Sequence, residues 1–132
     1  MYLIDTSVWL ELLLEQKKAK DVRHFLEKVD HTTLHISEFT LYSLGIILLR
    51  LKKAELFLLF VRDTLLEAGI RLVKLRPEDM ETLVKTADRF SLDFDDAYQY
   101  IAAAKLELEI ISFDSHFDHT EKGRKMPAQV EV

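Results

Sequence analysis

Short apolar segments that alternate with helical patterns constrain the fold of this chain more than any other feature. Five of them are predicted to form β-strands: Met1–Asp5, Thr32–Ile36, Ile70–Leu75, Glu109–Phe113 and Gln129–Val132. Strands that alternate with helices form mostly parallel sheets, because each parallel connection must cross over the sheet. We therefore predict an α/β fold of three layers, with a mostly parallel central sheet flanked by helices.

The segments between these strands carry helical periodicity and end signals. Helices are predicted from Val8 to about Glu15, over Ala19–Val29, from Ser37 to Leu51, over Ala54–Glu67, from Pro77 to Phe90, and after Asp93. Ser37 is a favourable N-cap, and Gly69 suits the left-handed residue that ends a helix. Pro77 suits the first position of the next helix. The helix over Ala54–Glu67 is apolar around most of its circumference, which indicates burial or a partner.

Composition predicts one domain, residues 1–132, with 48% apolar content and no cysteine. The lack of cysteine excludes thiolate metal sites and cysteine nucleophiles, and is compatible with a cytoplasmic protein. The longest strongly apolar run, Leu56–Val61, is too short to span a bilayer, so no membrane partner is expected. A net charge of −5 gives no general attraction for nucleic acid. Three scattered glycines cannot form a phosphate-binding loop.

Acidic residues stand where predicted strands end or where a helix begins. Asp5 and Asp114 each follow a strand, and Asp93, Asp95 and Asp96 surround a helix start. In parallel sheets, ligands bind beyond the carboxyl ends of the strands. Carboxylates that meet there repel one another unless a cation is present, and oxygen ligands suit Mg²⁺ or Mn²⁺. These residues therefore predict a metal site.

Each acid also has a purely structural interpretation. Asp5 is placed to cap the helix that follows it, and Asp93 with Asp96 resembles a capping box. Asp114 suits an Asx-turn. Three neighbours are auxiliary candidates: Thr6 and Ser7, whose hydroxyls can orient a ligand, and Asp118. His116 and His119 are expected to be exposed loop residues rather than ligands.

Four motifs, in this order, resemble those of the PIN-domain ribonucleases, especially the VapC-like toxins of toxin–antitoxin pairs. They are Leu3-Ile4-Asp5-Thr6-Ser7-Val8-Trp9-Leu10, Ile36-Ser37-Glu38-Phe39-Thr40-Leu41, Leu92-Asp93-Phe94-Asp95-Asp96-Ala97 and Ile111-Ser112-Phe113-Asp114-Ser115-His116-Phe117. The resemblance covers essentially the whole chain, and it implies a PIN-like form of the three-layer fold.

The resemblance also implies a set of site residues. Asp5, Asp96 and Asp114 would gather at one end of the sheet and bind Mg²⁺ or Mn²⁺, with Asp93 and Asp118 as auxiliary residues. The family usually carries a glutamate in the second turn of the helix after the second strand, where this chain has Ser43. Glu38, five residues earlier, is the expected substitute and a candidate fourth catalytic acid.

The leading functional hypothesis is a metal-dependent endoribonuclease that hydrolyses RNA phosphodiester bonds, with the role of toxin in a toxin–antitoxin pair as a further hypothesis. One alternative is a PIN-fold interaction module with weak or absent catalysis, which Ser43 favours. The other is a metal-dependent phosphatase that acts on small phosphoesters. The expected partners are RNA, a protein antitoxin and a second copy of the chain. The apolar helix over Ala54–Glu67 is the candidate surface for either protein partner, with core packing as the alternative.

Overall fold

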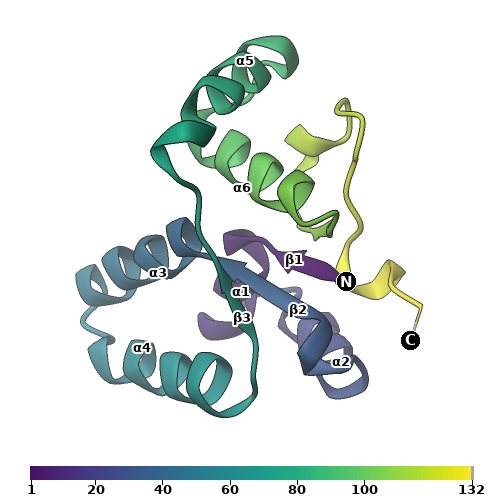
Figure 1. Ribbon diagram of the computed structural model, residues 1–132. Coiled ribbons are helices and arrows are strands. Elements are labelled where there is room, and N and C mark those ends of the chain that lie inside the picture. The colour runs from purple at the N-terminus through teal and green to yellow at the C-terminus, as the bar shows by residue number, and fades with distance from the viewer. Residues whose placement is uncertain (132) are drawn as a thin grey trace.

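The computed structural model describes residues 1–131 as a parallel sheet between two layers of helices (Figure 1). The sheet consists of β1 (Tyr2–Ile4), β2 (Leu34–Ser37), β3 (Arg71–Val73) and β4 (Glu109–Ile111). Its strand order is β3-β2-β1-β4, and every neighbouring pair is parallel. The predicted α/β three-layer architecture is therefore confirmed.

Helices connect the strands close to the predicted bounds. They are α1 (Thr6–Leu13), α2 (Ala19–Lys28), α3 (Glu38–Arg50), α4 (Ala54–Val61), α5 (Met80–Phe90) and α6 (Phe94–Lys105). The predicted helix over Ala54–Glu67 is present as α4 followed by a π-helical segment, Arg62–Glu67. Single 3₁₀ turns cover His31–Thr33, Pro77–Asp79, Ser115–Phe117 and Pro127–Gln129.

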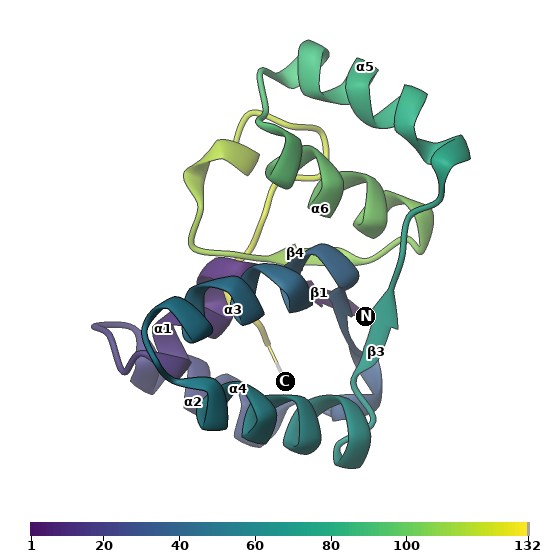
Figure 2. The ribbon, with the colours of Figure 1, turned by 90° about the vertical axis from the view of Figure 1, so that its left-hand side faces the viewer.

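The hydrophobic core is divided between the two faces of the sheet. Successive strand residues point to opposite faces, so Leu3 belongs to the cluster beneath α5 and α6, whereas Ile4 belongs to the cluster with α1 to α4. Ile110 and Ile111 divide in the same way. Figure 2 shows α5 and α6 on one side of β4 and β1, and the other four helices on the opposite side.

Local chain chemistry explains where the helices begin and end. The hydroxyl of Ser37 accepts a hydrogen bond of 3.0 Å from the backbone N–H of Thr40, which makes Ser37 the predicted N-cap of α3. Gly69 has a φ of +80°, a value that favours glycine. It ends the helical segment after α4 and turns the chain into β3. Both predictions are confirmed.

The predicted last strand, Gln129–Val132, is wrong for its described residues, Gln129–Glu131. Gln129 ends a 3₁₀ turn that begins at Pro127, and the Gln129 side chain accepts a hydrogen bond of 2.8 Å from the backbone N–H of Met126. Val132 lies outside the described residues. Lys125 pairs with β4 instead, since its N–H donates to Ile110 O and its carbonyl accepts from Ser112 N–H, both at 2.9 Å. Proline at the first turn position favours the 3₁₀ turn over a strand.

Across residues 1–131, none of the helices combines the length and the apolar character that a transmembrane span needs.

The side chains on the buried face of α3 should contribute more to the stability of the protein than those on its exposed face. We predict that Leu44→Ala, at a fully buried position, lowers the free energy of unfolding by about 2–5 kcal/mol through lost burial and a residual cavity. Leu49→Ala on the same helix, where the side chain is 56% exposed, should change it by less than about 0.5 kcal/mol. Urea unfolding followed by circular dichroism measures both. Equal losses would contradict this assignment of the two faces.

Candidate metal centre

A cavity of about 300 Å³ lies where β1 and β4 end and where α3 and α6 begin. It is lined by Asp5, Thr6, Ser7, Leu10, Phe39, Ser43, Ile47, Asp95, Asp96, Gln99 and Asp114. β1 and β4 are neighbours in the sheet, so Asp5 and Asp114, which follow them, reach the same edge. Asp96 arrives from the first turn of α6. The structure therefore brings all three predicted acids to one cavity.

Asp5 is buried and held by three neutral hydrogen-bond donors. Its Oδ2 accepts from Ser112 Oγ at 2.6 Å and from Ser7 Oγ at 2.9 Å, and its Oδ1 accepts from Gln99 Nε2 at 2.9 Å. Asp5 occupies the N-cap position of α1, yet its side chain makes no capping hydrogen bond. Helix capping therefore does not explain this carboxylate.

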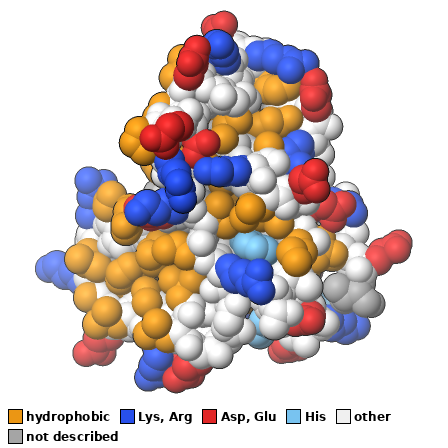
Figure 3. Space-filling model, viewed as in Figure 1, with side chains coloured by type: hydrophobic (Ala, Val, Ile, Leu, Met, Phe, Trp, Pro, Cys, Tyr) orange, Lys and Arg blue, Asp and Glu red, His pale blue; other side chains and the backbone are white. Residues whose placement is uncertain are grey.

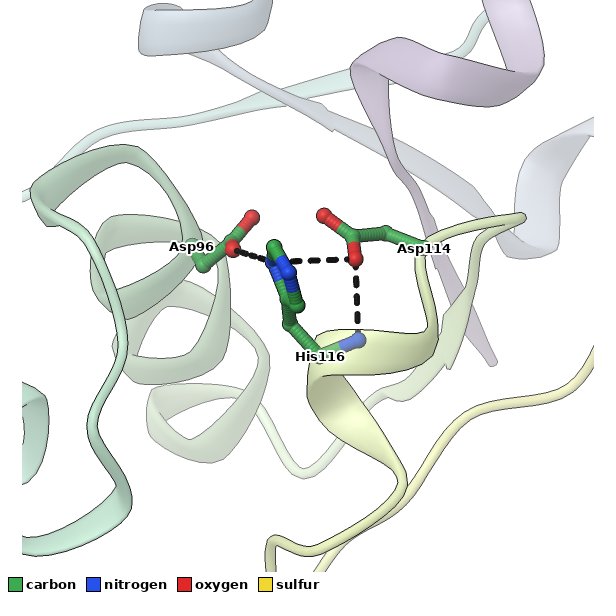
Figure 4. Close-up of side chains that lie close together, drawn as sticks. All are labelled: Asp96, Asp114 and His116. Carbon is green, nitrogen blue, oxygen red and sulfur yellow. Dashed lines mark hydrogen bonds and ion pairs between the residues drawn. The ribbon is translucent and has the colours of Figure 1, made fainter.

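Asp96 and Asp114 face each other across the ring of His116 (Figure 4). His116 Nδ1 lies 3.0 Å from Asp96 Oδ2 and 3.1 Å from Asp114 Oδ1. One potential ligand atom from each of the three residues lies within 4.8 Å of the others. Asp114 also accepts a hydrogen bond of 2.9 Å from the backbone N–H of His116, so it forms the alternative Asx-turn as well.

The electrostatic environment of this group opposes negative charge. Burial raises the pKa of Asp96 to about 6, and the nearby acids Asp114, Asp95 and Asp5 add to this effect, while the hydrogen bond from His116 opposes it. The hydrogen bond to Asp96 raises the pKa of His116, with a further contribution from Asp114. Positive charge between Asp96 and Asp114 lowers the electrostatic energy, and the ring of His116, whose pKa is raised, is the titratable group that the chain places there.

Gln99 and Ser112 are site residues that sequence reasoning missed. Both side chains are almost completely buried, and each donates to Asp5. Gln99 also donates to Thr40 Oγ1 at 2.6 Å, which links α6 to α3. The position of Gln99 three residues after Asp96, on the same face of α6, was the available signal. His116 was expected to be a loop residue only, and its contacts with Asp96 and Asp114 were missed as well.

The remaining predicted site residues fall into two groups. Thr6 and Ser7 line the cavity, as does Ser43. Asp93 stands at the N-cap of α6 without a side-chain capping bond, and Asp118 forms a two-point ion pair with Arg124 at 2.9 and 3.2 Å. Neither of these two acids lines the cavity, nor does Glu38, whose carboxylate lies beside the phenol of Tyr42 and raises its pKa. The role of Glu38 as a substitute for the glutamate missing at Ser43 stays a prediction.

The donor set fits a hard divalent cation. Asp5, Asp96 and Asp114 offer carboxylate oxygens, Asp95 lies at the cavity wall, and His116 offers a ring nitrogen. No lysine or arginine is among the described residues that line the cavity, so no basic side chain lies at its wall to balance the acids. Such oxygen-rich sites select Mg²⁺ or Mn²⁺ over softer metals.

Comparison with known proteins identifies the family. The model of the PIN domain matches residues 2–123, which is most of the chain. The chain therefore belongs to the PIN domain family, and the family resemblance of its four motifs is confirmed. Among curated proteins, no significant sequence match is found.

Solved structures share the fold at low sequence identity. VapC20 of Mycobacterium tuberculosis, a toxin that cleaves the sarcin–ricin loop, has a TM-score of 0.79 at 16% identity, over 92% of this chain and 96% of that one. A chain of a toxin–antitoxin complex from Klebsiella pneumoniae has a TM-score of 0.74 at 17% identity, over the full length of both. A chain of FitAB bound to an IR36 DNA fragment has a TM-score of 0.82 at 19% identity, over 100% of this chain and 99% of that one.

The raised pKa of Asp96 makes a prediction for the metal-free protein. A raised pKa means that the folded state favours the protonated form, so this contribution to stability is complete below 3.8 and is lost as the pH rises through about 6. Asp96→Asn should therefore melt at a higher temperature than the unmodified chain at about pH 8, and the difference should shrink toward about pH 5. Differential scanning fluorimetry in a chelator measures this.

The exposed neighbour Asp95 provides the matched control. Asp95→Asn removes the same charge from the same turn of α6 without relieving a buried carboxyl, so it should raise the melting temperature at about pH 8 by much less than Asp96→Asn does. An Asp96→Asn protein that is less stable than the unmodified chain at about pH 8 would contradict the assigned effect of burial.

Proposed function

We infer that this protein is a metal-dependent endoribonuclease of the PIN type. The observation that carries the proposal is the convergence of Asp5, Asp96 and Asp114 on one cavity at the carboxyl ends of β1 and β4. Membership of the PIN domain family supports it. The neighbour VapC20 is described as a toxin that cleaves the sarcin–ricin loop, an RNA target.

The proposed ligands of Mg²⁺ or Mn²⁺ are Asp5, Asp96 and Asp114. A bound divalent cation would supply an activated water and would stabilise charge on the scissile phosphate. The chain's own residues orient the site: Ser7 and Ser112 fix one carboxylate oxygen of Asp5. When no cation is bound, Nδ1 of His116 lies within hydrogen-bonding distance of both Asp96 and Asp114.

An aromatic group beside the cavity favours a nucleic acid over a small phosphoester. Phe39 lines the cavity and lies 6.0 Å from the ring of Phe94 and 5.4 Å from that of Tyr98. Phe94 is 52% exposed, although it stands only two residues before Asp96. Exposed rings next to a phosphodiester site suit the unstacked bases of single-stranded RNA. A substrate without a base has no use for them.

A second candidate function is a PIN-fold interaction module with weak catalysis. Ser43 lines the cavity at the position where the family usually has a glutamate, and Glu38 does not line the cavity in its place. A site with one carboxylate fewer should bind its cation more weakly. This geometry keeps the alternative open, and the cleavage experiment separates the two candidates.

Protein partners are proposed for the helical layer that contains α3 and α4. Within α4, Ala54–Val61, Phe60 is the one buried residue. By contrast, Leu58 on α4 is 66% exposed, and Leu66, in the π-helical segment that follows α4, is 75% exposed. On α3, Ile46 and Leu49 are more than half exposed, and Figure 3 shows hydrophobic side chains gathered over these two helices. Core packing thus accounts for one side of α4 only. An antitoxin or a second copy of the chain is the proposed partner, supported by the neighbour that comes from a toxin–antitoxin complex.

RNA cleavage in the presence of Mn²⁺ or Mg²⁺ tests the enzyme. The purified protein should cut an RNA with single-stranded loops and leave a small phosphoester such as p-nitrophenyl phosphate intact. Asp96→Asn and Asp114→Asn should each reduce the cleavage rate by more than the roughly 100-fold that changes in the outer shell of a metal site cause. Glu38→Gln is the matched acid-to-amide control outside the cavity and should retain activity.

Three other results would change the interpretation. Cleavage that persists in Asp96→Asn would indicate a contaminating nuclease. Hydrolysis of the small phosphoester alone would favour a phosphatase. Absence of both activities, in a protein that is folded by circular dichroism, would favour the interaction module.

The role of Phe94 in binding bases has a separate kinetic test. Phe94→Ala should raise KM for single-stranded RNA by about fivefold or more, since stacking of a base on an aromatic side chain is worth roughly 1–3 kcal/mol. The kcat should change little, because Phe94 is not among the residues that line the cavity. Phe94→Tyr preserves the ring and should behave like the unmodified chain. An unchanged KM in Phe94→Ala would remove stacking from the proposal.

A further inference from the structure

The amide group of Gln99 has only one chemically consistent orientation. A carboxylate oxygen accepts hydrogen bonds and donates none, so the group that faces Asp5 Oδ1 at 2.9 Å must be the amide nitrogen. The same nitrogen lies 2.6 Å from Thr40 Oγ1. Both amide hydrogens are thereby used, one for each partner, and the carbonyl oxygen of the amide is left to face elsewhere.

The neighbouring hydroxyls reinforce this orientation. Thr40 Oγ1 accepts from Gln99 and from Ser37 Oγ at 3.2 Å, so its own hydrogen is directed to Thr6 Oγ1 at 2.8 Å. Thr40 and Ser37 are fully buried. The chain of donors runs from α6 through α3 to α1, and each step depends on the preceding one. A reversed amide would break it at Asp5 and at Thr40 together.

The amide oxygen of Gln99 has no hydrogen-bond partner among the described residues. The side chain is only 2% exposed, and Gln99 is one of the residues that line the acidic cavity. A buried acceptor without a donor is destabilising, because it has lost its hydrogen bonds to water and gained none in the protein. The other unsatisfied atoms of the described chain are nitrogens, on Trp9 and His35, and neither residue lines this cavity.

An orphan acceptor among carboxylates points to a cation. Asp5, Asp95, Asp96 and Asp114 present acceptor oxygens to the same cavity, so they cannot satisfy another acceptor. A divalent cation, or a water molecule that it holds, satisfies all of them together, and amide oxygens are ordinary ligands of such ions. The unpaired oxygen of Gln99 therefore supports a cation in this cavity independently of the closeness of the acids.

We propose that Gln99 is a neutral oxygen ligand of the cation in this cavity and partly takes the place of the glutamate that the family has where this chain carries Ser43. The inference rests on the proposed function only in assuming that the cavity binds Mg²⁺ or Mn²⁺. In this arrangement the Gln99 nitrogen fixes Asp5 and its oxygen contacts the cation, so a single side chain performs both tasks.

Two variants of Gln99 separate a ligand from a residue that only holds Asp5. Gln99→Met has a similar volume and loses both the donor and the oxygen, whereas Gln99→Glu loses the donor and keeps an oxygen. Binding of Mn²⁺ is measured by isothermal titration calorimetry and by the shift in melting temperature, with no RNA present. We expect Gln99→Met to weaken Mn²⁺ binding by at least about tenfold, and Gln99→Glu to bind Mn²⁺ at least as tightly as the unmodified chain.

Gln99→Glu carries a further expected result. It places a new carboxylate 2.9 Å from Asp5 in place of the amide nitrogen, so the metal-free variant should melt at a lower temperature and should gain more stability from Mn²⁺ than the unmodified chain. Thr40→Val is the matched control, since it removes the other partner of the amide nitrogen and leaves the oxygen in place. It should retain Mn²⁺ binding within about threefold, a smaller loss than outer-shell changes at a metal site usually cause.

The outcomes distinguish this inference from the proposed function. If the unmodified chain binds no Mn²⁺, the proposed metal-dependent function fails. If it binds Mn²⁺ and loses it in Asp96→Asn but not in Gln99→Met, only the role of Gln99 is overturned. If both Gln99 variants weaken binding equally, Gln99 acts on Asp5 alone and is no ligand. Should Gln99→Met fail to fold, Gln99→Glu decides alone, and a tenfold loss in it would overturn the proposal.

Discussion

Parallel pairing between β1 and β4 is the constraint on which the rest of the site depends. The two strands run side by side with Ile4 opposite Ile111, so the chain leaves both at the same edge of the sheet. The N–H of Asp5 donates to Ile111 O at 2.9 Å and extends the pairing by one step. This contact fixes the backbone of Asp5 beside Ser112, and Ser112 then donates to the carboxylate. An antiparallel β4 would carry Asp114 to the opposite edge.

Neutral donors hold Asp5, whereas Asp96 and Asp114 are bridged by an imidazole ring. The difference has a chemical consequence. Hydroxyl and amide donors fix the orientation of the Asp5 carboxylate and bring no positive charge to it. The Asp96 and Asp114 carboxylates instead lie 3.0 and 3.1 Å from Nδ1 of His116. The site thus combines one carboxylate held by neutral donors with a pair of carboxylates held by a titratable ring.

The sequence predicted the site residues that directly follow strands. It did not predict those whose side chains reach the cavity from the middle of a helix. Asp5 and Asp114 follow apolar strands, and the carboxyl-end rule for parallel sheets places such residues together. Gln99 carried no comparable signal, because a glutamine in the middle of a helix is usually solvated, and only the packing of α6 on β1 shows that it reaches Asp5. Glu38 stays a predicted substitute, but it lies on a different face of α3 from Ser43, because a shift of five residues along a helix changes the face by well over a quarter turn. The last predicted strand failed because Pro127 favours a local turn over pairing.

Because the core is divided between the two faces of the sheet, the cavity takes its residues from both helical layers. Asp96 and Gln99 come from α6, which packs on one face of the sheet, whereas Thr6, Ser7 and Thr40 come from α1 and α3 on the other face. The hydrogen bond between Gln99 and Thr40 crosses the line where the two layers meet, and a bound cation would cross it again. The cavity therefore lies between the two helical layers, each of which packs on its own face of the sheet. A ligand in the cavity would contact residues of both layers. Loosening of either layer would move the residues of the cavity apart, so occupancy of the cavity would depend on how firmly the two layers are docked.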